Sequence, residues 1–273
     1  MLNNIYFCQR PLKHIIDMTS EISRSTNFLF HYTSLDSAIK IIYTGRLKFG
    51  RFENTNDIAE IRRETYDGKD SETLGEILTE YQSISFTYDC QGLDRGFAID
   101  CLWGYYAQKG NGVCLVFDRD KILSQYNALY QIQGVPLDKR ISYIENFTNL
   151  IISSEEHDQG ISDFVKNNLS DIFYTKDKCW EHEREIRLLA CSQTDQFLPI
   201  GDSLVGAIIC VPHEIDYTKS IQYIVLKSLQ SKMDFKIYHY TTNFGNKQII
   251  EEGNVVWPIL GIDYKIDDTA FNV

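Results

Sequence analysis

The stretch FLFHYTSLDSAIKIIYTGRLKFG, residues 28–50, is the feature that most constrains the fold. Its first five residues are an apolar and aromatic run, which predicts a strand. The next apolar residues follow at the spacing of one helical face: Leu35, Ala38, Ile39 and Ile42. Ser34 before them is a good helix N-cap, and Gly45 after them is a plausible helix stop. Leu47 and Phe49 begin a second short strand, so this part of the chain must fold as strand, helix and strand.

The same two periodicities alternate through the rest of the chain. Strand patterns recur at residues 83–88, 113–117, 185–190, 204–211 and 235–239. Helical spacing fits residues 74–81, 101–107 and 221–225, and residues 119–173 are interpreted as a mainly helical insertion. Strands and helices mixed in this order predict an α+β fold around a mixed or antiparallel sheet.

We expect one domain over residues 1–273, because no repeat, low-complexity linker or proline-rich segment divides the chain. The strand patterns on either side of the helical insertion are also too few to form separate cores. Residues 1–26 are interpreted as an N-terminal arm or helix, and residues 240–273 as a C-terminal extension.

Charge and cysteine content exclude several classes of protein. A net charge of −11 argues against a broadly basic, nucleic-acid-binding surface. The seven cysteines show no Cys-x-x-Cys spacing, which favours free thiols in a reducing cytoplasm. No apolar run is long enough to span a bilayer, and the first residues lack the pattern of a signal peptide. We therefore expect a cytoplasmic protein without a membrane partner.

Three stretches carry side chains that could bind a ligand. His31 ends the first strand and could hydrogen-bond ligand hydroxyls beside the ring of Tyr32, although a structural histidine fits equally. Asn56 lies in a polar loop that could either contact a ligand or simply form a turn. Trp103 and Tyr106 share one side of a predicted helix, where they could form the wall of a slot for a planar ring or belong to the core.

A fourth stretch, WEHEREIRLL at residues 180–189, raises a question about its glutamates. Glu183, Glu185 and Arg187 alternate, so a strand would place all three on one face, directly after Trp180. The arginine would keep a carboxylate ionised, and an ionised carboxylate could stabilise an oxocarbenium-like centre on a sugar. The alternative is an ordinary ion pair on a solvent-facing strand.

Taken in order, these stretches resemble a known bacterial family. The matching residues are His31-Tyr32, Phe52 with Asn56-Asp57, Trp103-x-x-Tyr106-Ala107, Gly112-x-Cys114-x-x-Phe117-Asp118, and Lys176 followed by Trp180-x-x-Glu183-x-Glu185-x-Arg187. They resemble the family catalogued as domain-of-unknown-function family 2971, over roughly residues 28–240. Tyr105 and Gly110 stand where that family often has histidines, which counts against proton transfer there.

The layout is also similar, more weakly, to the ADP-ribosyltransferase superfamily. This similarity implies an ADP-ribosyltransferase-like sheet, NAD as the substrate and no metal. The implied catalytic residues are Glu183 and Glu185. The implied NAD-binding residues are His31 on the ribose, Trp103 or Tyr106 stacking on nicotinamide, and Tyr32, Asn56 and Arg187 beside them.

The resemblance implies an NAD-dependent ADP-ribosyltransferase, in a toxin or phage-defence setting, that modifies a protein or nucleic-acid acceptor. An antitoxin or chaperone is an expected partner. One alternative is a non-catalytic sensor domain that binds a nucleotide or peptide. Another is a metal-dependent nuclease that uses Asp57, Glu183 and Glu185. No zinc spacing, phosphate-binding loop, dinucleotide fingerprint or serine elbow is present.

Overall fold

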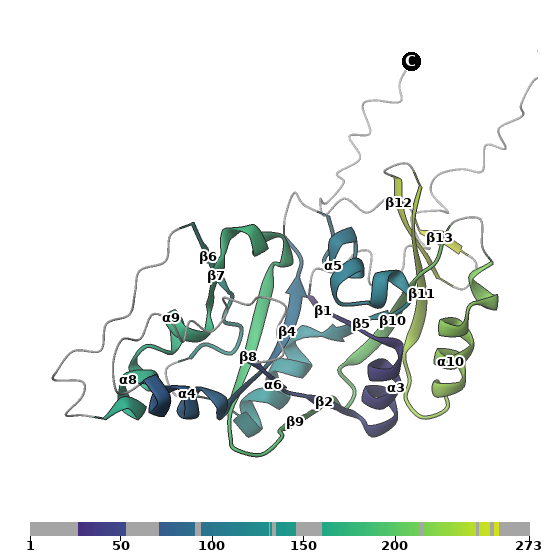
Figure 1. Ribbon diagram of the computed structural model, residues 1–273. Coiled ribbons are helices and arrows are strands. Elements are labelled where there is room, and N and C mark those ends of the chain that lie inside the picture. Colours follow the sequence, from purple (N-terminus) through teal and green to yellow (C-terminus); the bar gives the residue numbers. More distant parts are fainter. Residues whose placement is uncertain are drawn as a thin grey trace, which may run out of the picture.

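The computed structural model describes residues 27–52, 71–90, 94–130, 132, 135–145, 160–212, 216–243, 246–251 and 254–256. Within these ranges the chain forms a mixed sheet of nine strands with helices on both faces (Figure 1). The α+β class predicted from the periodicities is confirmed. The expected arm at residues 1–26 and the loop with Asn56 and Asp57 lie outside the described residues.

The strand order in the large sheet is β13-β12-β11-β10-β5-β1-β4-β3, and β8 also pairs with β4. The strands are β1 (Phe28–Thr33), β3 (Gly50–Arg51), β4 (Tyr81–Tyr88), β5 (Val113–Asp118), β8 (Glu185–Cys191), β10 (Leu204–Cys210), β11 (Lys236–Asn243), β12 (Asn246–Glu251) and β13 (Asn254–Val256). Only β10 and β11 are parallel; the other pairs in this sheet are antiparallel. Two small sheets pair β2 (Arg46–Lys48) with β9 (Phe197–Pro199), and β6 (Ser142–Ile144) with β7 (Thr175–Asp177).

One face of the sheet packs against three helices, namely α3 (Leu35–Thr44), α6 (Arg119–Tyr130) and α10 (Ile221–Leu229). Helix α3 begins and ends where its sequence predicts. The Ser34 hydroxyl accepts from the Ser37 amide, and Gly45 adopts the left-handed conformation at φ 66°. In α10 the expected apolar face is partly wrong, because Ile221 and Ile224 are exposed and Leu226 faces the core.

The opposite face carries two separate apolar clusters. Helix α5 (Asp100–Tyr105) covers the first cluster, and α4 (Ser71–Thr79), α8 (Ile161–Asn167) and α9 (Leu169–Phe173) cover the second. In the first cluster the Trp103 ring stacks on Tyr240 and meets Tyr32 edge to face. Polar and charged side chains occupy this face between the two clusters.

A gap in the pairing of β4 positions these polar side chains. Strand β4 pairs with β1 only at Thr87 and Tyr88, and with β3 only at Gln82 and Ser83. Between these points, no strand of the described chain covers that edge of β4. The ring of His31 fills part of the gap, and its Nδ1–H donates to the Ser85 carbonyl at 3.0 Å.

The predicted helical insertion at residues 119–173 is interrupted. After α6, the segment Ser142–Ile144 forms β6, which pairs in parallel with β7; only then do α8 and α9 follow. The sheet also continues through β11 to β13 into the segment expected as a C-terminal extension. None of the described helices is long and apolar enough to cross a membrane.

Candidate active site

A cavity of about 450 Å³ opens at the gap beside β4. This volume lies within the usual range for small-molecule sites. The cavity is lined by predicted site residues from three separate parts of the chain: His31, Tyr32, Tyr106, Glu183, Glu185 and Arg187. The fold therefore brings together residues that lie up to 156 positions apart in the sequence.

Glu183 reaches the cavity from a 3-10 helix, η4 (Lys178–Glu183), and not from a strand. The helix ends at Arg184, which adopts the left-handed conformation at φ 47°, and β8 starts one residue later. The expectation that Glu183 and Glu185 share a strand face is therefore wrong, because the backbone turns between them. Glu183 is 4% exposed and accepts hydrogen bonds from the Tyr106 hydroxyl and from Lys176 Nζ at 2.8 Å.

Glu185 and Arg187 do share a face of β8, and both are buried. Arg187 Nε donates to Glu185 Oε1 at 2.7 Å, and Arg187 Nη2 donates to Oε2 at 2.9 Å. The Ser85 hydroxyl donates to Oε1 at 2.5 Å, and Arg187 Nη1 donates to the Phe173 carbonyl at 2.6 Å. With exposures of 3% and 2%, these residues are not the solvent-facing ion pair that the sequence left open.

Lys176 links the two glutamates. It lies on β7, is 5% exposed, and its Nζ contacts Glu183 Oε2 at 2.8 Å and Glu185 Oε2 at 2.9 Å. Two carboxylates and two cations therefore balance when all are ionised. Lys176 is part of the sequence pattern that resembles the family. A single lysine, however, does not predict ion pairs with Glu183 and Glu185, seven and nine positions later.

The environments of the two glutamates move their pKa values in opposite directions. Burial raises the pKa of Glu183 above its usual value, and Lys176 opposes that rise only in part. Burial would also raise the pKa of Glu185, but Arg187 and Lys176 outweigh it and hold this pKa well below the usual range. Glu185 is thus ionised at neutral pH, whereas Glu183 is the member of the pair that takes up a proton at the higher pH.

His31 is a neutral hydrogen-bonding group in this environment. Burial lowers its pKa, and the bond to Ser85 O requires the proton on Nδ1. The other ring nitrogen, Nε2, is then an acceptor. The ring also lies edge-on to Phe86 with centroids 5.8 Å apart. A neutral histidine at the cavity wall suits a hydroxyl donor on a ligand.

Aromatic side chains of α5 divide between core and cavity. Trp103 is 3% exposed, its indole N–H donates to the Phe97 carbonyl at 2.8 Å, and it does not line the cavity. Of the two alternatives that the sequence left open for Trp103, its position in the structure is that of a core residue. Tyr105, which no sequence pattern marked as a ligand-binding residue, lines the cavity together with Tyr106 and is 57% exposed.

Tyr32 lines the cavity, whereas Trp180 packs against residues that line it. The Tyr32 hydroxyl donates to the Gly96 carbonyl at 2.8 Å and its ring packs in the first cluster, and the residue also lines the cavity. Trp180 is half-buried in η4, where its ring contacts Tyr105 and lies 5.8 Å from Lys176 Nζ. It therefore packs over the cation of the cluster.

The cluster is poorly suited to a metal ion. Across the described ranges, no group of three histidine, cysteine, aspartate or glutamate side chains is placed to hold one. Lys176 and Arg187 already occupy the carboxylate oxygens that a nuclease metal would need. Asp57, the third residue of the nuclease alternative, lies outside the described residues.

Comparison with known proteins supports one of the two resemblances. Residues 102–188 match the model of a family described as "Protein of unknown function (DUF2971)". The matched segment runs from α5 to β8, so it contains Tyr106, Lys176, Glu183, Glu185 and Arg187 of the cluster. No curated protein and no solved structure matches the chain significantly. The similarity to ADP-ribosyltransferases stays a prediction.

Proposed function

We propose that the protein is an NAD-dependent ADP-ribosyltransferase and that Glu183 is its catalytic carboxylate. One observation carries this proposal: Glu183, His31 and Tyr106 line the same cavity, although the sequence places them far apart. That trio combines a carboxylate, a neutral hydrogen-bond acceptor and an aromatic ring. These are the groups that a ribosyl pyridinium ligand requires.

The cavity can hold the nicotinamide riboside half of NAD. The rings of Tyr105 and Tyr106 offer flat surfaces for the cationic nicotinamide ring. His31 Nε2 can accept a hydrogen bond from a ribose hydroxyl, because Nδ1 holds the only ring proton. Both contacts orient the glycosidic bond towards Glu183.

The proposed reaction breaks the bond between C1′ of the ribose and the nicotinamide nitrogen. The electron pair of that bond leaves with nicotinamide, and positive charge develops on the ribose. The carboxylate of Glu183 stabilises this charge. A nucleophile of the acceptor then forms the new bond to C1′ and loses its proton to solvent, so the glutamate is unchanged at the end.

Two neighbours fix the direction of the Glu183 carboxylate. The Tyr106 hydroxyl binds one oxygen and Lys176 binds the other. Glu185 in turn holds Lys176 and is itself held by Arg187. We therefore assign catalysis to Glu183 and positioning to Glu185, instead of treating the two glutamates as equivalent.

The wider setting belongs to the same proposal. The acceptor is a macromolecule, either protein or nucleic acid, and the expected context is a cytoplasmic toxin or phage-defence effector with an antitoxin or chaperone. These points rest on the resemblance alone. The second candidate is a sensor that binds a nucleotide in this cavity without cleaving it, which the raised pKa of a buried Glu183 also permits.

Nicotinamide release tests the proposal directly. Purified protein is incubated with NAD, and nicotinamide is quantified by chromatography for wild type, Glu183→Gln and the control Glu145→Gln. Glu145 does not line the cavity and is exposed. We expect Glu183→Gln to lose activity by about 10²–10³-fold and the control to match wild type. Wild-type protein that binds NAD by calorimetry without releasing nicotinamide would instead support the sensor.

A further inference from the structure

Two basic side chains line the cavity at a distance from the glutamates. Lys48 ends β2 and Arg51 ends β3, and both line the same cavity as Glu183. Along β4, Arg51 pairs with Gln82, whereas Glu185 reaches the sheet opposite Thr87. Five residues of extended chain separate these positions, about 16 Å. The two basic residues therefore meet a different part of the ligand from the part that meets the glutamates.

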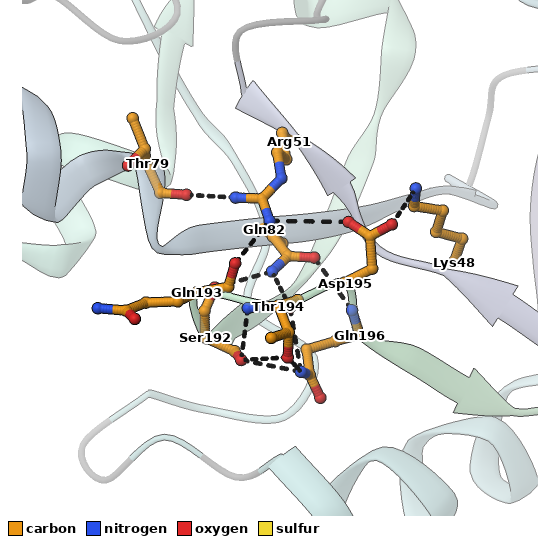
Figure 2. A network of polar contacts seen from close by, with 9 residues as sticks. All are labelled: Lys48, Arg51, Thr79, Gln82, Ser192, Gln193, Thr194, Asp195 and Gln196. Carbon is orange, nitrogen blue, oxygen red and sulfur yellow. Dashed lines mark hydrogen bonds and ion pairs between the residues drawn. The ribbon is translucent and has the colours of Figure 1, made fainter.

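Arg51 is fixed in position by backbone carbonyls from two other segments. Its Nη1 donates to the Thr79 carbonyl at 2.8 Å, and its Nη2 donates to the Gln193 carbonyl at 3.0 Å (Figure 2). A guanidinium has five N–H donors, so these bonds do not exhaust it. The side chain is 27% exposed and can meet an anion from the cavity without first becoming ordered.

Asp195 holds the second cation beside the first. Its carboxylate lies 2.6 Å from Lys48 Nζ and 3.7 Å from Arg51 Nη2. The carboxylate is 45% exposed, so solvent and solutes reach this pair. An acidic group between two basic ones leaves a local excess of one positive charge, in a protein whose net charge is −11.

The turn that carries Asp195 is anchored to the sheet by a fully buried glutamine. Gln82 Nε2 donates to the Ser192 and Thr194 carbonyls at 2.9 and 2.8 Å, and Gln82 Oε1 accepts from the Gln196 amide (Figure 2). Residues 192–196 are therefore held in place independently of the ion pair. The backbone at Asp195 is therefore held beside the two cations, whereas its half-exposed carboxylate is held only by the ion pairs.

We propose that Lys48 and Arg51 form a subsite for the diphosphate of the ligand, with Asp195 occupying it until the ligand binds. Phosphate oxygens make charge-assisted hydrogen bonds of the same kind as a carboxylate, and a diphosphate brings more charge than one aspartate. The subsite rests on the proposed function and assigns residues to the diphosphate of NAD. The ligand is a nucleoside linked to a diphosphate, and a nucleoside without phosphate leaves the subsite empty.

Calorimetric titration with ADP-ribose tests the subsite without requiring catalysis. Lys48→Gln should weaken ADP-ribose binding about tenfold, because one charge-assisted contact is lost. Asp195→Asn should tighten binding severalfold, because the competing anion is removed; a merely structural role for Asp195 predicts no gain. The matched control is Lys121→Gln, since Lys121 forms a similar exposed pair with Asp202 at 2.7 Å but does not line this cavity. Nicotinamide riboside should bind wild type and all three variants equally.

The outcomes separate this proposal from the proposed function. ADP-ribose binding that depends on Lys48, in a protein that releases no nicotinamide, supports the subsite and overturns the transferase. Nicotinamide release by wild type with the same KM for NAD in Lys48→Gln overturns the subsite and leaves the transferase standing. Equal ADP-ribose affinity in Lys48→Gln, Asp195→Asn and wild type, or no ADP-ribose binding at all, also overturns the subsite.

Discussion

Replacing Glu185 by glutamine should destabilise the protein far more than the same change at Glu183. Donors surround both oxygens of the Glu185 carboxylate. It accepts hydrogen bonds from Arg187 Nε, Arg187 Nη2 and the Ser85 hydroxyl, and Lys176 Nζ contacts it as well. A glutamine side chain can accept through one of its two terminal atoms only. Its NH₂ group would face donors and would carry no negative charge.

The expected cost follows from the burial of Arg187. This side chain is 2% exposed, and its contacts with the Phe173 carbonyl and the face of the Phe52 ring bring no negative charge to replace Glu185. Removing one member of a buried ion pair costs about 3–5 kcal/mol, because the other charge stays buried. Glu185→Gln should therefore lower the free energy of unfolding by about this amount at pH 7.

Glu183→Gln is the matched comparison, with the same chemical change two residues away. Burial raises the pKa of Glu183, so the folded protein holds this group less well as an anion than the unfolded chain does. The amide oxygen can still accept from Tyr106, and Lys176 keeps Glu185 as its partner. We expect a loss of about 1 kcal/mol or less.

Urea unfolding at pH 7, followed by tryptophan fluorescence and circular dichroism, measures both variants against wild type and the exposed control Glu145→Gln. The slope with urea concentration must stay constant for the free energies to be comparable. If Glu185→Gln loses less than about 1 kcal/mol, Arg187 is not buried as described. If Glu183→Gln loses as much as Glu185→Gln, the division into a structural and a catalytic glutamate is wrong.

Trp103→Ala should cost about 3–5 kcal/mol in the same urea assay because the ring is buried, whereas half-buried Trp180→Ala should cost about 1 kcal/mol; equal costs would contradict the two placements. Because only ionised Glu183 stabilises a cation and its pKa is raised, nicotinamide release at saturating NAD should increase with pH through a midpoint above the ordinary glutamate value of 4.5. A rate that falls with increasing pH across that range would assign the chemistry to a protonated group instead.

Local patterns in the sequence identified most of the elements because each depends on neighbouring residues. Ser34 and Gly45 bound α3 through contacts within a few positions of the chain. The alternation of Val113 to Phe117 likewise follows from two apolar faces of the sheet, and each face buries its own set. Such signals need no knowledge of which strands meet.

The errors arise where the backbone departs from a regular pattern. Arg184 adopts a left-handed conformation that few residues other than glycine favour, so nothing in the sequence marks the break that moves Glu183 off the strand. Helix α5 ends at Tyr105, and Tyr106 is its cap. The spacing of a continuous helix therefore grouped Trp103 with Tyr106, although one ring enters the core and the other borders the cavity.

The site itself depends on pairings between distant segments, which periodicity cannot supply. The gap beside β4 exists because β1 and β3 each pair with only two residues of that strand. Lys48, Arg51 and Ser85 line the cavity only as a result of this register. The sequence placed His31, Tyr106 and Glu183 together solely through a resemblance. No motif indicated that Lys48 and Arg51 would line the same cavity.

The question raised by two glutamates so close in sequence has a physical answer in their unequal surroundings. A buried carboxylate that must serve as a catalytic anion needs a cation nearby, yet a single buried lysine would be costly without a second acid. Glu185 supplies that acid, and Arg187 balances it, so Lys176 can remain charged beside Glu183. The ion pair of Glu185 and Arg187 thus allows Glu183 to line the cavity with a pKa above its usual value. One glutamate alone, or two in identical surroundings, would not provide both the stable cation and the titratable anion.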